Sequence, residues 1–195
     1  MIHLPKIPPR KSKIVVNRGR NEEESRFVAK LKFEDRELHF EMCLTAEEAD
    51  VYQNARTSYE KVKAIHSDRE VLRHWNEQKF ISLHEHFGEQ IRRYCGLAKY
   101  DPRAKKKAEE YCELQIQFAP VAKRSFKNDP FSKGLPEHTG YRCLIELMLE
   151  DGRFGEALYL ARLAREEGWK GPWKEIVERI RRVESIDPGS RGERF

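Results

Sequence analysis

Two segments of helical periodicity, separated by the dipeptide Asp151-Gly152, restrict the fold of this chain more than any other feature. Apolar residues between Tyr141 and Leu149 cover more than one stripe of a helix, so this helix needs packing partners on more than one side. Gly152 readily adopts the left-handed backbone conformation that ends a helix. In the segment that follows, small residues recur every three or four positions, at Ala157, Ala161 and Ala164. Since small side chains let two helix backbones approach closely, the pattern predicts a pair of antiparallel helices.

A third helix is predicted directly after this pair. Gly168 is placed to end the second helix, and Pro172 suits the first turn of the next one, where a backbone N–H has no intrahelical partner. Further on, apolar residues fall on one face of a helix, at Trp173, Ile176, Val177, Ile180 and Val183. We therefore expect residues 137–183 to form a helical hairpin with a capping helix, and residues 184–195 to form a flexible tail.

The residue types of this segment resemble one tetratricopeptide repeat. The family pattern has an aromatic residue, a leucine, a bulky residue, a Gly-x-aromatic turn and then small residues. The matching positions here are Tyr141, Leu144, Met148, Gly152, Phe154, Ala157, Ala161 and Ala164. Ile145 and Trp169 depart from the pattern, because the family often has a small residue at the first position and proline at the second. A weaker upstream match has the spacing of the second helix of such a repeat, at Ala108, Cys112 and Pro120. An ordinary helical hairpin is the alternative interpretation.

The resemblance implies that the first helix of the pair lines a concave groove that binds another protein or a peptide. The corresponding positions in this sequence are Thr139, Arg142, Glu146, Leu149 and Glu150. Arg142 would bind a carboxylate of the partner, and Leu149 would supply an apolar contact. One and a half repeats are too few for a long superhelical groove. The alternative is that these five residues are ordinary exposed or packed positions of a helix.

The first 25 residues have the composition of a basic, disordered tail, with three prolines that oppose regular structure. The first 20 residues contain no acidic side chain but six basic ones, Lys6, Arg10, Lys11, Lys13, Arg18 and Arg20. The positive net charge of the whole chain, +5, therefore comes from this segment. A basic arm of this kind binds nucleic acid in a salt-dependent way, which makes a nucleic-acid-associated protein the alternative function. A solvated tail without a ligand is another interpretation, and Ile14-Val15-Val16 leaves open a short edge strand.

Between residues 26 and 44 the hydrophobic period changes to two, which predicts a β-hairpin with one apolar face. An isolated hairpin is marginally stable in water, so we expect it to pack on the helices or to pair with a third strand.

A helical region is predicted for residues 45–128, and a loop with two prolines and a glycine for residues 129–136. Thr45 and Glu48 have the spacing of a capping box at the start of this region. Pro120 is expected to kink or end the last helix, because proline removes a backbone donor and clashes with the preceding turn. The predicted fold is mainly α: a helical-hairpin, tetratricopeptide-like array with a small N-terminal β-hairpin.

Residues with catalytic or metal-binding chemistry are scattered. His84 and His86 lie two positions apart, and on a helix they point about 200° away from each other, so they cannot share a metal ion. We interpret them and His74 as surface histidines of a helix. The chain has no Gly-rich phosphate loop, no Gly-x-Ser-x-Gly elbow and no His-Glu-x-x-His motif. The sequence therefore predicts a non-enzymatic protein without a cofactor, while an active site assembled from distant residues remains the alternative.

The four cysteines, Cys43, Cys95, Cys112 and Cys143, include no Cys-x-x-Cys pair and lie in apolar or periodic segments. We therefore expect reduced cysteines rather than a structural disulfide. No apolar run is long enough to span a bilayer, and the N-terminus lacks the apolar core of a signal peptide. These observations predict a cytoplasmic protein that has no membrane contact.

Overall fold

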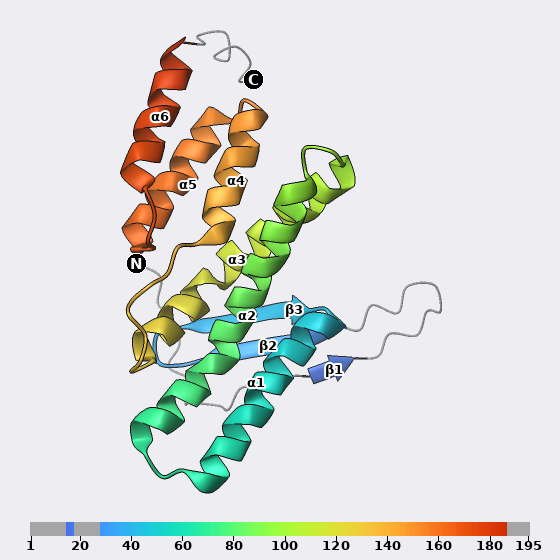
Figure 1. The fold of residues 1–195 in the computed structure, drawn as a ribbon, viewed down its shortest axis with the longest axis vertical. Coiled ribbons are helices and arrows are strands. Elements are labelled where there is room, and N and C mark those ends of the chain that lie inside the picture. The colour runs from blue at the N-terminus through green and yellow to red at the C-terminus, as the bar shows by residue number, and fades with distance from the viewer. Residues whose placement is uncertain (1–14, 18–27, 187–195) are drawn as a thin grey trace, which may run out of the picture. The chain divides into compact units, whose positions relative to one another are not determined.

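The computed structural model describes residues 15–17 and 28–186 of the chain (Figure 1). The elements in order are β1 (Val15–Asn17), β2 (Val28–Glu34), β3 (His39–Leu44), α1 (Ala46–Ile65), α2 (Arg69–Leu97), α3 (Pro102–Asn128), α4 (Thr139–Glu150), α5 (Phe154–Glu167) and α6 (Trp173–Ile186). The predicted fold class, mainly α with an N-terminal β-hairpin, is confirmed. None of the helices in the described ranges is long and apolar enough to cross a lipid bilayer.

The chain forms two compact units, and both long helices contribute to each of them. One unit comprises the residues up to His86 together with Ala119–Phe131, and the other comprises Phe87–Phe118 and the residues from Ser132 onward. The boundaries thus fall inside α2 and α3, and between Phe131 and Ser132 in the segment expected to be a loop. Each unit is described separately below.

The sheet of the first unit is antiparallel, with the strand order β1-β2-β3. Alternation places Leu31 of β2 and Met42 and Leu44 of β3 in the core, where each is at most 4% exposed. Val15 and Val16 pair with Lys30 and Ala29 of β2. The short edge strand left open by the sequence is therefore present, and residues 15–17 are not part of a disordered tail, because β-branched residues favour an extended backbone.

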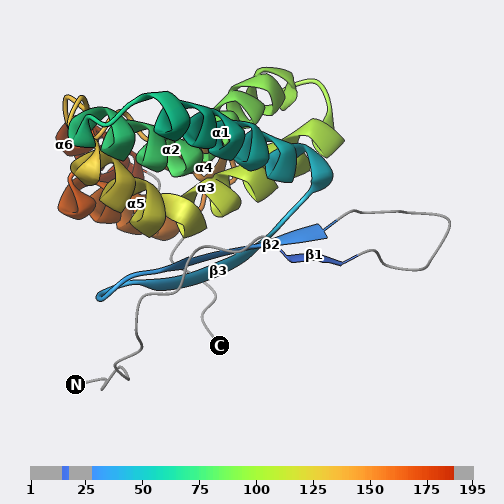
Figure 2. The same ribbon diagram turned by 90° about the horizontal axis from the view of Figure 1, so that it is seen from below.

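Helix α1 begins at the predicted capping box. The Thr45 backbone N–H donates to Glu48 Oε2 at 2.8 Å, and the Glu48 N–H donates back to Thr45 Oγ1 at 3.4 Å. Phe80 of α2 packs edge-to-face on Phe33 of the sheet, with ring centroids 4.9 Å apart, and also contacts Tyr52 of α1. Figure 2 shows the helices of this unit lying over one face of the sheet.

The interpretation of His84 and His86 as surface residues is wrong. His84 is 3% exposed and packs edge-to-face on Phe126 of α3, and His86 is 9% exposed. The reason is visible in the spacing, because Phe80, His84 and Phe87 recur every three or four residues and share the buried stripe of α2. Burial lowers the pKa of His84 to about 4. His74 is only half-buried, and its Nδ1 lies 2.9 Å from Asp129 Oδ1.

Helix α3 does not end at Pro120 but continues to Asn128. The residues on both sides of the proline are among the most buried of the chain: Phe118, Ala119, Val121 and Ala122 are each at most 1% exposed. Packing of this apolar stretch therefore outweighs the loss of one backbone hydrogen bond, a case of tertiary contacts overriding local propensity.

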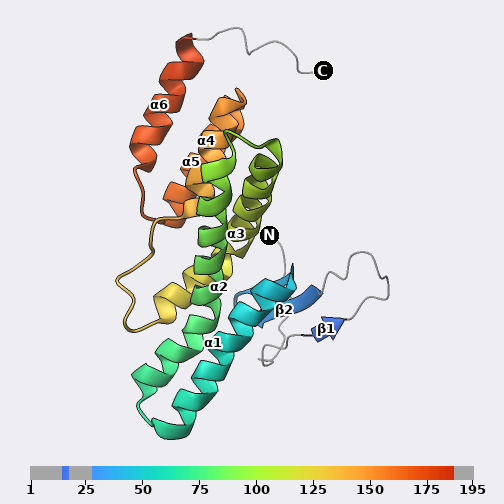
Figure 3. The same ribbon diagram turned by 45° about the vertical axis from the view of Figure 1, so that its right-hand side comes forward.

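The second unit contains the three C-terminal helices. Figures 1 and 3 show α5 lying between α4 and α6. Three residues join α4 to α5, and Gly152 adopts a positive φ of 72° there. The alanines at 157, 161 and 164 are fully buried, and α6 buries Trp173, Ile176, Val177 and Ile180. Within the described residues, the residue pattern of the repeat occurs on one pair of short helices, α4 and α5. The weaker upstream match lies inside the 27-residue helix α3, and membership in the repeat family remains a prediction.

Candidate functional site

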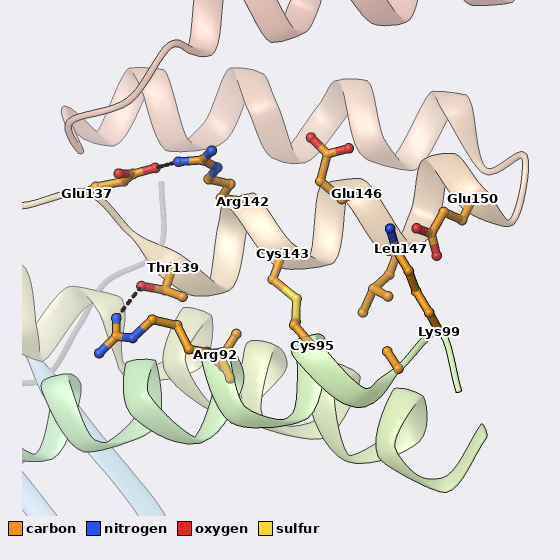
Figure 4. Close-up of a pocket in the computed structure, with 12 residues that line it drawn as sticks. Arg92, Cys95, Lys99, Glu137, Thr139, Arg142, Cys143, Glu146, Leu147 and Glu150 are labelled. Atoms are coloured by element: carbon orange, nitrogen blue, oxygen red, sulfur yellow. Dashed lines mark hydrogen bonds and ion pairs between the residues drawn. A yellow bond between two sulfur atoms is a disulfide. The ribbon is translucent and has the colours of Figure 1, made fainter. Parts of the chain in front are cut away.

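A cavity of about 560 Å³ lies between the C-terminal part of α2 and one face of α4, within the second compact unit. We call it the α2–α4 cleft. Its α2 wall is formed by Ile91, Arg92, Cys95, Ala98 and Lys99. Its α4 wall is formed by Glu137, Thr139, Arg142, Cys143, Glu146, Leu147 and Glu150 (Figure 4). The volume is in the range of pockets that bind ligands.

The face of α4 that lines the cleft follows from helical spacing. Thr139, Cys143, Leu147 and Glu150 recur every three or four residues and so lie on one side of the helix, with Arg142 and Glu146 beside them. The other sides of α4 are apolar and buried, with Tyr141, Leu144, Ile145 and Met148 each at most 7% exposed. Packing on these sides fixes the rotation of α4 and so determines which residues enter the cleft.

The first N–H groups of α4 have no intrahelical acceptor, and they donate hydrogen bonds to side chains nearby. Gly140 N donates to Gln115 Oε1 of α3 at 2.6 Å, and the amide of Gln115 is fully buried. Tyr141 N donates to Nδ1 of His138, the N-cap residue, at 3.3 Å. On the α2 side, Arg92 Nη1 donates to Thr139 Oγ1 at 3.4 Å, as Figure 4 shows. These contacts hold the start of α4 against α2 and α3.

Cys95 and Cys143 form a disulfide that joins the two walls of the cleft, with their Cα atoms 6.9 Å apart. The expectation of four reduced cysteines without a disulfide is therefore wrong. The two residues are 48 positions apart and lie on different helices, so no local motif could reveal the pair. Cys43 is an exposed free thiol, and Cys112 is free and buried, where burial raises the pKa of its thiol to about 12.

The charges of the cleft are divided between its walls. On the α4 wall, Arg142 Nη1 donates to Glu137 Oε1 at 2.5 Å, and this pairing raises the pKa of Arg142. Glu146 accepts from Arg179 of α6 at 2.6 Å. Neither Lys99 nor Glu150 forms an ion pair with any residue in the part of the chain that the structure describes. The α2 wall is thus basic, through Arg92 and Lys99, and the C-terminal end of the α4 wall is acidic.

Four of the five residues expected to bind a partner line this cleft: Thr139, Arg142, Glu146 and Glu150. Leu149 is half-buried outside it, and Leu147 supplies the apolar contact instead. Leu149 lies roughly 90° around the helix from the centre of the lining stripe. The sequence reasoning missed Cys143 and Leu147, although both share the spacing of Thr139. It also missed the whole α2 wall, which no sequence pattern marks.

Other candidate residues do not gather into a site. At the start of α3 four basic residues lie close together in the sequence, and two of them are paired, Lys105 with Asp151 at 2.5 Å and Lys107 with Glu110 at 2.6 Å. Within residues 15–17 and 28–186, no group of three or more His, Cys, Asp or Glu residues could hold a metal ion. The six basic residues of the N-terminal arm lie outside the described residues.

Comparison of the chain with protein-family models, with curated proteins and with solved structures found no match. The fold and the cleft therefore define the molecule only as a helical protein with a small antiparallel sheet and a charged, disulfide-bridged cleft.

Proposed function

We propose that this chain is a non-enzymatic protein-interaction module of tetratricopeptide-like type, which binds a segment of a partner protein in the α2–α4 cleft. The observation that carries the proposal is the convergence of Thr139, Arg142, Glu146 and Glu150 on one cavity. These residues correspond to the partner-binding positions of such repeats, and their side chains line a single cavity of the molecule.

The composition of the cleft supports a peptide segment as its ligand. Ala98 is half-buried and Leu147 is 5% exposed, so the two provide a small apolar contact area between a basic wall and an acidic one. An amphipathic segment matches this arrangement if its acidic side chains face Arg92 and Lys99 and a basic side chain faces Glu150. Such charge complementarity contributes more to the choice and orientation of the partner than to affinity. The proposed location of the complex is the cytoplasm.

The test is affinity capture of partners from the native cell lysate, performed with and without nuclease. Glu150→Arg and Arg142→Glu both alter the charge of the α4 wall. Glu166→Arg is the matched control, because Glu166 is exposed on α5 and does not line the cleft. We expect nuclease-resistant partners that are lost with both cleft variants and retained with the control. Capture that is unchanged by the two cleft variants would contradict the proposal.

The second candidate function is nucleic-acid association through the N-terminal arm, and the charge asymmetry of the sequence favours it. In this case deletion of residues 1–20 abolishes a salt-sensitive retention on immobilised nucleic acid, while Glu150→Arg leaves the retention unchanged. If the captured partners are lost with nuclease or with this deletion, binding occurs through the N-terminal arm rather than through the cleft.

A further inference from the structure

The Cys95–Cys143 disulfide is placed where a reagent in the cleft can reach it. Both cysteines line the cavity and are half-buried, in contrast to the fully buried Cys112. The bond is also the covalent link between the α2 wall and the middle of the α4 wall, as Figure 4 shows. Reduction of this pair would therefore remove the covalent link between the two walls.

The two sulfur atoms have different electrostatic surroundings. Arg92 lies on α2 three residues before Cys95, and Lys99 lies in the turn after α2, four residues beyond Cys95; both line the cleft. Near Cys143 both charged neighbours are paired, Arg142 with Glu137 and Glu146 with Arg179 of α6. Positive charge stabilises a thiolate, so negative charge is better accommodated on the sulfur of Cys95 than on that of Cys143.

We propose that Cys95 and Cys143 form a thiol–disulfide exchange site for low-molecular-weight thiols, and that the exchange controls binding in the cleft. The thiolate of the small thiol attacks Sγ of Cys143 and forms a mixed disulfide there. The bond between the two cysteines breaks, and its electron pair leaves on Sγ of Cys95, which becomes the thiolate. A second small thiol then attacks the mixed disulfide. The net change is two protein thiols and one oxidised small-molecule disulfide, a transfer of two electrons.

Reduction acts on the cleft because the Arg92–Thr139 hydrogen bond joins α2 to α4 at the start of α4 and not at its middle. The hydrogen bonds of Thr139 and Gly140 hold the first turn, and the exposed Lys105–Asp151 pair lies just after the last one. Cys143 lies between them, and the Glu146–Arg179 pair near it joins α4 to α6 rather than to α2, so release of Cys143 removes the covalent link between the two walls at this point. This control of partner binding rests on the function proposed above, whereas the exchange chemistry does not. In a reducing compartment, a disulfide of this kind is regulatory more often than structural.

The exchange is tested on the full-length Cys43→Ser protein, which lacks the exposed free thiol. The oxidised protein is treated with reduced glutathione, quenched by alkylation at intervals and analysed by mass spectrometry of its peptides. We expect a transient glutathione adduct on Cys143 before both cysteines become alkylated. Lys99→Glu should slow the reduction about threefold, because it removes a charge that stabilises the leaving thiolate. Lys106→Glu, an equal charge change on an exposed residue outside the cleft, should leave the rate nearly unchanged.

Three results would overturn the exchange site: no disulfide in the aerobically purified protein, an adduct mainly on Cys95, or equal rates for the two lysine variants. The control of the cleft has separate readouts. Reduction should increase hydrogen exchange of residues 143–150 severalfold and change the capture of cleft-dependent partners. If the adducts form as expected but hydrogen exchange is the same in both redox states, the control of the cleft is wrong. If partner capture fails in both redox states while hydrogen exchange differs between them, only the proposed function is wrong.

Discussion

The close approach of α3 and α4 at Gly140 allows a quantitative test of how the cleft wall is held. A Cβ atom at this position would lie 2.9 Å from Gln115 Oε1, 3.1 Å from the Cys112 backbone oxygen and 3.3 Å from Gln115 Cβ. Gln115 has little freedom to withdraw, since its Oε1 accepts the buried Gly140 N–H at 2.6 Å. Gly140→Ala therefore forces either a backbone shift of α4 or the loss of that hydrogen bond.

Both responses to Gly140→Ala have known magnitudes. An extra methyl in a tightly packed interior lowers the free energy of unfolding by roughly 1–3 kcal/mol. Leaving a buried N–H without its acceptor lowers it by about 1–3 kcal/mol. Replacement of glycine by alanine in a helix raises the free energy of unfolding by at most about 1 kcal/mol. We expect a net loss of about 1–2 kcal/mol by urea unfolding.

Gly155→Ala is the matched control, because Gly155 occupies the same second position of α5 and no atom would lie within 4 Å of its Cβ. This variant should raise the free energy of unfolding by up to about 1 kcal/mol. The packing argument also predicts that Gly140→Ala has a smaller effect in a Gln115→Ala background. If Gly140→Ala is as stable as the parent protein while Gly155→Ala behaves as expected, the close approach of the two helices is refuted.

Three further predictions concern other parts of the chain. Because burial lowers the pKa of His84 to about 4 from 6.5, the unfolded state binds its proton first as the pH falls. The contribution of neutral His84 to the free energy of unfolding is fully present above pH 6.5, and its loss should lower that free energy by about 3 kcal/mol toward pH 4. In urea titrations, this pH dependence should be absent from His84→Leu. It should remain in His66→Leu, which changes an exposed position. Cys143→Ser opens a 48-residue loop and should lower the free energy of unfolding by up to about 4 kcal/mol, measured against the oxidised parent. Ala161→Leu should overpack the buried face of α5 and lower it by roughly 1–3 kcal/mol, which a fall in Tm would detect.

The parts of the fold that sequence reasoning predicted are those with local signals. The alternation of residues 28–44 predicts the hairpin, because one face of the strands is buried. The Thr45–Glu48 capping box marks the start of α1, and Gly152 and Gly168 mark turns that need positive φ. The predictions that the helix kinks or ends at Pro120 and that His84 lies on the surface depart from the structure for one common reason. Each is a locally unfavourable residue whose environment is decided by distant packing, which composition and spacing do not describe.

In the candidate site, too, local sequence patterns predict one part and distant packing determines the other. The α4 wall could be predicted, since a single helix face carries its residues at spacings of three and four. The α2 wall could not, because nothing in residues 91–99 indicates that the end of a 29-residue helix and the turn after it face α4 rather than solvent. Cys143 belongs to the predictable face and Cys95 to the unpredictable wall. A single sequence can therefore identify each cysteine as a half-buried helical residue, yet the disulfide follows only from the packing that brings the two helices together.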